Sequence, residues 1–576
     1  MLKRRIERRP AAAVLTGCPS HLHPVMARLY AARGVRDAAE LELGLGRLQP
    51  AHSLAGLEAA TTVLVEAVEQ RQRILVIGDF DADGATSTAV AIRALRAMGA
   101  AHVDFLVPDR FRFGYGLTPA IVEVAAGRRP DLLVTVDNGI SSVAGVAAAR
   151  AHGMRVLITD HHLPGAELPD ADAVVNPNQH GCAFPSKSLA GVGVIFYVLT
   201  ALRARLRAAG WFTAQGIEEP NLAHYLDLVA LGTVADVATL DANNRVLVAQ
   251  GLARIRAGRA CAGLNALLRI AGRDGARLSA MDLGFVLGPR LNAAGRLDDM
   301  SLGIRCLLAD TLDDALPLAR ELDRLNVERR AIEAEMQSEA AGELERMQLS
   351  GALPFGLCLF EPHWHEGVIG LLASRVKERV HRPVVVFTRA ENGELKGSAR
   401  SVSGLHVRDA LEAIATREPD LLVRFGGHAM AAGLTLRDGE LERFRRAFDE
   451  EVRRHLDVRD LDGALMTDGS LAPEDAELEL AEQIRAGGPW GQGFPEPRFD
   501  DVFEIAQQRI VGERHLKMRL RWPGEARTVD AIAFNRAPSA NPQVRTVYRL
   551  DVNEYRGERT LQFVVDYMEP CSGSAE

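Results

Sequence analysis

The chain has 576 residues, of which 47% are hydrophobic and 25% charged, and its formal net charge is −8. This length exceeds what one hydrophobic core supports, so we expect several domains. No apolar stretch approaches the roughly 18 residues of a membrane span, the basic N-terminus lacks an apolar signal core, and the six cysteines are scattered. We therefore expect a cytoplasmic protein with reduced thiols and no membrane partner.

Residues 1–50 are rich in Arg and Ala and predict a helical lead-in. From about residue 55 to 240, helical stretches such as 85–98 and 143–152 alternate with short apolar runs. These strand-like runs lie near residues 74–78, 103–107, 132–136, 155–159 and 173–175. The alternation predicts βαβ units and a parallel sheet covered on both faces. A mostly helical section is expected from about 190 to 300.

Residues 319–347 contain neither Pro nor Gly apart from Gly342 and are dense in Arg, Glu, Leu and Ala. This composition predicts a long connecting helix of roughly 40 Å at 1.5 Å per residue. A second α/β domain is expected to follow it, with strands near 356–360 and 383–387 and an end near residue 455.

The last hundred residues alternate apolar and polar positions, as in residues 516–522 and 561–567, which predicts a small β-barrel or sandwich. Lys517, Arg519 and Arg521 would lie on one face of a strand, where they could bind nucleic acid. The alternative is that these basic residues only protect an edge strand from aggregation. The net charge of −8 does not exclude such a local basic surface.

Potential metal ligands follow one of the predicted strands. Asp79, Asp81 and Asp83 stand at alternate positions directly after the apolar run at 74–77. Three neighbouring carboxylates repel one another and are costly to remove from water. A divalent cation is the usual reason that such a cluster is tolerated.

The same pattern recurs at two further strands. Asp137 and the run Asp160-His161-His162 each follow an apolar strand-like segment. A single Asp after a strand is most often a helix N-cap, and a single His pair is more often solvated or buried in the core. The carboxyl ends of parallel strands meet at one edge of a sheet, so we expect these segments to lie together. The pattern predicts a metal-dependent hydrolase.

Four motifs resemble those of the DHH phosphoesterase superfamily in kind and order: Asp-Phe-Asp-Ala-Asp-Gly at 79–84, Val-Asp-Asn-Gly at 136–139, Asp-His-His at 160–162 and Gly-Thr-Val-Ala-Asp at 232–236. Four more, at 288–296, 364–370, 397–401 and 425–428, resemble the RecJ branch of that superfamily. The resemblance covers nearly the whole chain. It implies a metal-dependent 5′→3′ exonuclease that degrades single-stranded DNA to mononucleotides in DNA repair and recombination.

The expected fold class is therefore α/β multidomain, with a parallel-sheet DHH domain and a second α/β domain joined by a long helix, plus a small β-barrel of the OB-fold type. The expected divisions are a helical lead-in at 1–50, a DHH catalytic domain at 51–305, a connecting helix at 306–350, a DHHA1-like substrate-binding domain at 351–458 and a nucleic-acid-binding OB-fold at 459–576.

The resemblance also implies a site with two divalent metal ions, Mn2+ or Mg2+. Hard cations of this kind prefer carboxylate oxygens with few imidazoles. The implied ligands are Asp81, Asp83, Asp137, His161 and Asp236, with Asp79 as an additional ligand and Asp137 as the bridge between the ions. Two more catalytic roles are expected nearby: Asp160 orients His161, and His162 faces the scissile phosphate. A purely structural Asp160 is the alternative.

Residues expected to bind the substrate are Arg110, Arg290, Arg296, Ser398, Arg400, Gly426, Gly427 and His428. By the family pattern, Ser398 and Arg400 bind the 5′ phosphate, while the glycines let a phosphate approach the backbone closely. For each arginine the alternative is an ordinary salt bridge. Trp364 and Phe425 could stack on bases, although core aromatic residues are commoner.

Two other functions stay open at this point. One is a DHH phosphoesterase acting on short oligonucleotides, cyclic dinucleotides or polyphosphate, and the other is a non-catalytic replication scaffold. Dinucleotide binding is disfavoured because no Gly-x-Gly-x-x-Gly follows the first strand of the sheet. The expected partners are single-stranded DNA, a single-strand-binding protein and a helicase. A monomer would suffice, because one chain supplies the whole site.

Overall fold

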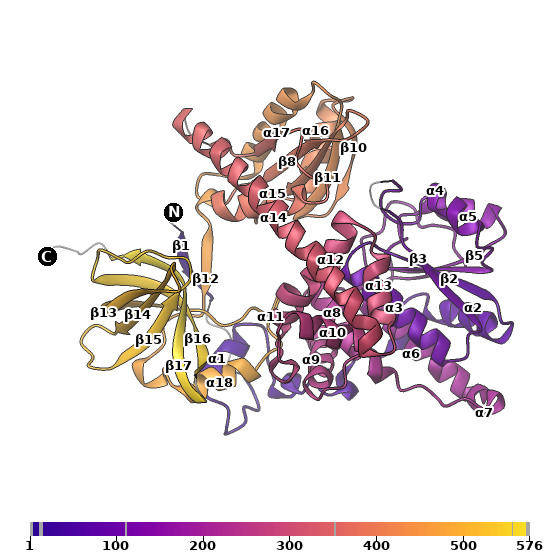
Figure 1. Ribbon diagram of the computed structural model, residues 1–576, viewed down its shortest axis with the longest axis horizontal. Coiled ribbons are helices and arrows are strands. Elements are labelled where there is room, and N and C mark those ends of the chain that lie inside the picture. Colours follow the sequence, from indigo (N-terminus) through magenta and orange to yellow (C-terminus); the bar gives the residue numbers. More distant parts are fainter. Residues whose placement is uncertain (1–3, 11–14, 110–111, 351–352, 556, 572–576) are drawn as a thin grey trace. The chain divides into compact units, whose positions relative to one another are not determined.

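The computed structural model describes residues 4–10, 15–109, 112–350, 353–555 and 557–571 (Figure 1). It divides into two compact units, each described here by itself. The first comprises Arg9–Asn326 and Asp468–Glu576, and the second comprises Met1–Arg8 and Val327–Thr467. None of the helices in the described part of the chain is long and apolar enough to cross a membrane.

A five-stranded sheet with the order β3-β2-β4-β5-β6 lies in the first unit. Every neighbouring pair in it is parallel. Its strands are β2 (Arg73–Gly78), β3 (His102–Leu106), β4 (Leu132–Val136), β5 (Arg155–Thr159) and β6 (Ala173–Val175). The predicted parallel sheet is confirmed.

Helices cover both faces of this sheet. Ile74 and Val76 of β2 pack on the side of α2 (Leu57–Glu69), α3 (Ala82–Ala97) and α6 (Gly191–Ala208), whereas Leu75 and Ile77 pack on the side of α4 (Pro119–Ala126) and α5 (Val143–Ala151). Figure 1 shows these helices on opposite sides of the strands. Burial on both faces explains why the strands are continuous apolar runs in the sequence.

The section from about 190 to 300 is mostly helical, as predicted, and helical structure continues to Leu308. After α6 come α7 (Trp211–Gln215), α8 (Leu226–Ala235), α9 (Ala242–Arg256), α10 (Ala262–Ile270), α11 (Ala280–Asp282), a π-helix (Leu283–Leu287), α12 (Gly288–Leu297) and α13 (Ser301–Leu308).

The helical lead-in predicted for residues 1–50 is wrong for most of its length. The α-helix found among its described residues is α1 (Pro24–Ala31), and short 3-10 helices follow at Ala38–Leu41 and Leu45–Arg47. In the second unit, β1 (Arg5–Arg8) pairs in parallel with β12 (Ala464–Thr467). Frequent Pro and Gly interrupt the helix-favouring Ala and Arg, and pairing with a distant strand overrides local propensity.

The predicted long helix is confirmed and is longer than expected. It is α14 (Leu312–Ser350), with 39 residues, so its length is about 58 Å at 1.5 Å per residue. The prediction began after Pro317, because proline is disfavoured inside helices. In the structure Pro317 lies in the second turn, and Thr311 precedes the helix with its Oγ1 accepting a hydrogen bond from Asp314 N at 3.2 Å.

The second unit contains a five-stranded sheet with the order β10-β11-β9-β8-β7. Its strands are β7 (Leu357–Phe360), β8 (Val384–Arg389), β9 (Leu395–Arg400), β10 (Leu422–Gly427) and β11 (Ala431–Leu436). Apolar side chains of β9 and β11 pack against α16 (Val407–Arg417) and α17 (Leu441–His455), and α15 (Ile369–Val380) contacts β8 and β9. This is the predicted second α/β domain.

A closed barrel in the first unit has the order β13-β14-β15-β17-β16. Its strands are β13 (Phe499–Val511), β14 (His515–Arg521), β15 (Thr528–Ala533), β16 (Gln543–Tyr555) and β17 (Glu558–Pro570), and α18 (Leu478–Ala486) precedes them. Leu516, Met518 and Leu520 are buried. The alternation in the sequence therefore reports the inside and outside of a β-barrel, as predicted.

Candidate metal centre

Acidic and imidazole groups gather at the carboxyl ends of β2, β4 and β5 and at the end of α8. Their ligand atoms form three groups, and within each group the atoms lie within 4.8 Å of one another. The groups are Asp79/Asp81/Asp137, Asp83/His161/Asp236 and Asp137/His161/His162. All six metal ligands expected from the sequence are thus brought together, along with His162. Asp137 and His161 each belong to two groups.

Asp81 and Asp83 lie at the start of α3. Asp81 is the N-cap of this helix and accepts a hydrogen bond from Gly84 N at 3.0 Å. Asp83 is buried and accepts hydrogen bonds from Gly191 N at 2.6 Å and Val192 N at 3.0 Å. These donors form the first turn of α6, whose dipole favours a negative charge there.

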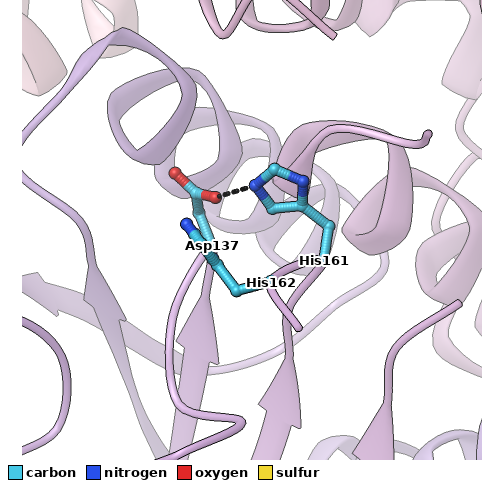
Figure 2. A group of neighbouring side chains, drawn as sticks. All are labelled: Asp137, His161 and His162. Atoms are coloured by element: carbon cyan, nitrogen blue, oxygen red, sulfur yellow. Dashed lines mark ion pairs between the residues drawn. The ribbon is translucent and has the colours of Figure 1, made fainter. Parts of the chain in front are cut away.

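Asp137 directly follows β4 and has a φ of 63°, in the left-handed region that few residues other than Gly adopt. Its main-chain N–H donates to Thr159 O at 3.0 Å, which ties it to the next strand. Figure 2 shows the His161 ring directed at its carboxylate, with Oδ1 and Nε2 3.0 Å apart. Asp137 Oδ1 is buried, and the described residues give it no hydrogen bond beyond this contact with His161, as suits a metal ligand.

Asp160 contacts a different imidazole from the one predicted. The sequence predicts that it orients His161, but its Oδ1 lies 2.7 Å from His162 Nδ1 and accepts the main-chain N–H of His161 at 2.7 Å. Its Oδ2 accepts Ile140 N at 2.9 Å. The residue two positions on, rather than the next one, therefore places its ring against the carboxylate.

Burial and mutual repulsion raise the pKa values of three carboxyl groups. Burial, followed by the charge of Asp81, raises the pKa of Asp83 to about 7. Burial and then the charge of Asp83 raise the pKa values of Asp137 and Asp236 well above their usual range. Ionising these buried carboxyl groups side by side is unfavourable without a counter-charge. A divalent cation bound between them would supply that charge and favour their ionised form.

The pKa values of Asp160 and His162 each shift against the direction that burial favours. Burial alone would raise the pKa of Asp160, but its hydrogen bond to His162 and the charges of both imidazoles lower it. Burial alone would lower the pKa of His162, but the hydrogen bond and charge of Asp160 raise it to about 9. These two residues therefore form an ion pair beside the ligand groups.

Tyr115 also lies at this site, although no pattern in the sequence singles it out beyond the glycines on either side. Its hydroxyl lies 3.0 Å from His162 Nδ1 and 3.3 Å from the main-chain oxygen of Asp137. Its ring meets Phe80 edge-on, with 6.2 Å between centroids.

Three asparagines position the ligand-bearing loops: Asn176 and Asn178, which the sequence does not single out, and Asn292, which lies in the motif at 288–296. Asn178 Nδ2 donates to His161 O at 2.6 Å, and Asn176 Nδ2 donates to His162 O at 2.9 Å. Asn292 Oδ1 accepts Ala82 N at 2.8 Å and so adds a side-chain acceptor to the start of α3.

In the second unit, two of the expected substrate residues contact each other on β9. Arg400 donates from Nη1 to Ser398 Oγ at 3.1 Å and from Nε to Ser374 Oγ at 3.2 Å. A Cβ at Gly370, near the start of α15, would lie 2.8 Å from Arg400 Nη2 and 3.0 Å from Ser398 Oγ. The absence of a side chain at position 370 thus leaves room for this pair.

One of the two expected glycines, Gly426, lies in register with Ser398 across the sheet. Ser398 pairs with Gly433 of β11, and Gly433 pairs with Gly426 of β10, so the three share one row on one face. A Cβ at Gly426 or Gly433 would meet nothing within 4 Å. His428 directly follows β10, and its N–H donates to Ala431 O at 2.7 Å. The sheet therefore places Gly426 in the same row as Ser398, whereas Gly427 pairs with Ala432 in the next row.

Other residues expected to bind the substrate contact neighbouring residues of the protein instead. Arg290 donates from Nε to Asp323 Oδ1 at 2.9 Å and from Nη1 to Val286 O at 2.6 Å, so the salt-bridge alternative describes it as the structure stands. Arg296 is half-buried on α12, and Arg110 lies outside the described residues. Trp364 is 3% exposed and donates to Glu339, so it is a core residue rather than a base-stacking platform.

The three basic residues of β14 lie opposite carboxylates on neighbouring strands. Lys517 and Arg519 each approach Asp530 at 3.6 Å, and Arg521 approaches Glu504 at 2.6 Å. Their side chains are 31% to 55% exposed. Within the barrel, this basic row is therefore partly neutralised.

Known protein families match three parts of the chain. Residues 73–233 match the DHH family N-terminal domain, 354–454 the DHHA1 domain and 467–567 the RecJ OB domain. The parallel sheet with acidic groups at its strand ends is thus the DHH type of domain.

Similarity to individual proteins extends over nearly the whole chain. It is 53% identical over 576 residues to the single-stranded-DNA-specific exonuclease RecJ of Salmonella typhimurium, covering 99% of this chain and 100% of that protein. The crystal structure of RecJ from Thermus thermophilus in complex with Mn2+ is 33% identical, with a TM-score of 0.77, and the match covers 95% of this chain and 76% of that one. For the Mg2+ complex the identity is 31%, the TM-score is 0.72 and the coverage is 95% and 75%. The chain therefore belongs to the RecJ family.

Proposed function

We propose that this chain is an exonuclease that degrades single-stranded DNA and depends on divalent metal ions, Mn2+ or Mg2+. The observation that carries the proposal is the convergence of three ligand groups that share Asp137 and His161. Relatives named single-stranded-DNA-specific exonuclease cover the full chain, and the related structures hold Mn2+ or Mg2+.

The residues that would hold the two ions are Asp79, Asp81, Asp83, Asp137, His161 and Asp236, of which Asp137 and His161 each belong to two ligand groups. Such ions, when bound, activate a water and neutralise the charge that builds on the phosphate during hydrolysis. The donor set of five carboxylates and one imidazole suits hard cations. The α6 N-terminus holds Asp83 in one orientation through two hydrogen bonds, which keeps the ligand set preorganised.

His162 is proposed to bind the scissile phosphate. Asp160 lies 2.7 Å from Nδ1 of its ring, which fixes the orientation of the ring. Because Asp160 also binds the main-chain N–H groups of Ile140 and His161, it can hold the ring without moving. The proposed role of Asp160 is therefore to position His162.

The proposed direction is 5′→3′, with mononucleotides as products. Ser398 and Arg400 supply a hydroxyl and a planar guanidinium in contact with each other, a combination suited to a terminal phosphate. The path by which the terminal phosphate reaches this pair is proposed to be lined by Gly426, Gly427 and His428. The DNA backbone is proposed to contact Arg296 and Arg110. Arg290 would need to exchange Asp323 for a phosphate to do the same.

We assign one role to each domain expected from the sequence. Residues 51–305 would carry out catalysis, residues 351–458, after the connecting helix at 306–350, would bind the substrate, and residues 459–576 would bind nucleic acid. A monomer working in the cytoplasm with a single-strand-binding protein and a helicase, in repair and recombination, remains our proposal. The basic row of β14 is proposed to follow the DNA backbone.

The test is digestion of a long single strand labelled at either end, beside a duplex and a dinucleotide, with Mn2+, with Mg2+ or with EDTA. We expect metal-dependent release of label from the 5′-labelled single strand first, and little digestion of the duplex. Preference for the dinucleotide would favour a short-oligonucleotide phosphoesterase. DNA binding without cleavage in either metal would favour a scaffold.

A further inference from the structure

A basic hollow lies at the amino ends of β2 and β3, whereas the ligand groups follow the carboxyl ends of the strands. Its volume is about 470 Å3. Arg73 and His102, which pair in register across the two strands, form part of its lining. The other charged groups in the lining are Arg96, Asp104 and Arg128. The hollow is therefore separate from the metal centre.

Two of its guanidinium groups are anchored on the free edge of the sheet. β3 is an edge strand, so alternate carbonyl groups along it lack a partner strand. Arg96 Nη2 donates to Val103 O at 3.0 Å, and Arg128 Nη1 donates to Phe105 O at 2.7 Å. Each guanidinium has five N–H donors, so both keep donors for a ligand while their positions are fixed. Fixed donors lose less entropy on binding.

Arg73 supplies a third guanidinium. Its main-chain N–H donates to Asp131 Oδ2 at 2.7 Å and its carbonyl accepts Asp131 N at 2.9 Å, which fixes its backbone at the start of β2. Within the described part of the chain, its side chain makes no hydrogen bond or ion pair. A guanidinium held at the rim of a hollow without an internal partner is available to an anion.

The acids near the hollow do not cancel this charge. Asp104 is the one carboxylate among the lining residues, and its Oδ2 is paired with Arg128 Nη1 at 3.0 Å. Its Oδ1 accepts the N–H of Phe105. Among the lining residues, three guanidinium groups therefore face one carboxylate, and the Asp131 carboxylate beside Arg73 accepts the Arg73 main-chain N–H.

We propose that this hollow binds a phosphate dianion, carried by a nucleoside monophosphate or as free phosphate. Guanidinium groups bind phosphate oxygens through paired, charge-assisted hydrogen bonds. The volume lies in the range of roughly 300–1,000 Å3 that small-molecule sites occupy. Leu75, Val103 and Pro130 in the lining give an apolar wall for a base or sugar. The site goes beyond the proposed nuclease function and does not depend on it.

The test is isothermal titration calorimetry on the full chain with dAMP, inorganic phosphate and deoxyadenosine. EDTA removes metal-dependent binding, and an Arg400→Ala background removes the phosphate site proposed on β9. We expect dAMP to bind, and Arg73→Ala to weaken its binding by about tenfold or more. Asp104→Asn should strengthen binding roughly threefold, since it removes the nearby negative charge. Arg259→Ala, which changes an exposed arginine outside the hollow, is the matched control and should have no effect.

Comparing dAMP, inorganic phosphate and deoxyadenosine shows whether the bound phosphate belongs to a nucleotide or is free phosphate. Tighter binding of dAMP than of phosphate would assign the site to a nucleotide, and equal binding would assign it to free phosphate. The proposal is overturned if deoxyadenosine binds as tightly as dAMP, if Arg73→Ala binds dAMP like its parent, or if neither phosphate ligand binds at millimolar concentration. Because the Arg73 side chain has no partner among the described residues, its replacement is expected to leave the melting temperature unchanged.

Discussion

Gly191 lies so close to Asp137 that a Cβ at position 191 would be 2.6 Å from Asp137 Oδ1 and 2.5 Å from its Cβ. The same glycine donates its N–H to Asp83. One residue at the start of α6 therefore sets the positions of two proposed metal ligands, one following β4 and one on α3.

Gly191→Ala is expected to displace Asp137 and reduce cleavage by roughly a hundredfold, because an error of about 1 Å in catalytic geometry has effects of this size. The stabilisation of the protein by Mn2+ should fall as well. Cleavage of a single-stranded oligonucleotide and the Mn2+-induced shift in melting temperature measure these effects.

Gly193→Ala is the matched control in the same helix. A Cβ there would meet the end of the Leu189 side chain at 2.9 Å, which can move. It should cost little activity. Equal loss of activity in the two variants would show that α6 tolerates no added methyl group, and that the contact with Asp137 has no special role.

Removing single ligands should abolish cleavage without unfolding the protein. Asp81→Asn keeps the N-cap acceptor of α3, and Asp137→Asn keeps a residue type that tolerates a positive φ. Each variant removes one charge from a repelling cluster, so its melting temperature in EDTA should hold or rise. More than a few per cent of wild-type cleavage in both variants and in His161→Ala would contradict the ligand assignment.

The stability of the metal-free protein should fall as pH rises from about 5 to 8. In the unfolded chain an Asp has a pKa of about 3.9, whereas burial and Asp81 raise the pKa of Asp83 to about 7 in the folded protein. The folded state therefore binds more protons between these values, and stability is lost as pH rises through them. The raised pKa of His162 acts in the same direction above pH 6.5.

Melting temperatures in EDTA across this pH range measure the effect. Asp83→Asn should flatten the dependence, because its side chain does not titrate. Saturating Mn2+ should also flatten it by favouring the ionised ligands. A melting temperature that rises with pH in EDTA, or an unchanged slope in Asp83→Asn, would contradict this account.

The sequence predicts that these acidic and imidazole groups lie together, because one physical rule governs their positions. Strands buried on both faces give continuous apolar runs, and a ligand directly after such a run must lie at the carboxyl edge of the sheet. Asp79, Asp137 and Asp160 follow this rule. Their backbone positions are set by the strands, so side-chain details hardly enter.

Features that depend on distant partners or on one loop conformation could not be predicted in this way. Arg290 binds Asp323 on α14, a helix whose start the sequence places too late. Arg5 pairs with Ala464, and nothing local to residues 4–10 indicates that strand. The contact of Asp160 with His162 rather than His161 depends on the turn after β5.

Arg400→Ala is expected to weaken the use of DNA that carries a 5′ phosphate much more than it weakens metal binding. Arg400→Lys should not fully rescue it, because lysine cannot reproduce the planar contacts of Nε and Nη1 with two serine hydroxyls. The ratio of kcat/KM for 5′-phosphorylated and 5′-hydroxyl single strands measures this effect. Arg389→Ala, which removes an exposed arginine of β8, is the control. Release of 3′ label first would refute the direction.

Replacing Lys517, Arg519 and Arg521 by Ala should flatten the salt dependence of single-strand binding. Each phosphate contact contributes about −0.7 to the slope of log affinity against log salt, so the slope should change by up to roughly two units. Long single strands should be cut less well, whereas very short oligonucleotides should still be cut, because the metal centre lies on the other sheet of the unit. Binding at several salt concentrations measures the slope.

Asp530→Asn separates the two explanations for this basic row. Asp530 lies 3.6 Å from both Lys517 and Arg519, so it competes with phosphate for them. Its replacement should strengthen DNA binding and steepen the salt slope if these residues contact the backbone, since single strands would gain the contacts that Asp530 now makes. If the row only protects the barrel from edge pairing, Asp530→Asn and the triple variant should both leave the affinity and the slope unchanged. In that case the proposed DNA track along β14 would be rejected, while the metal centre would be unaffected.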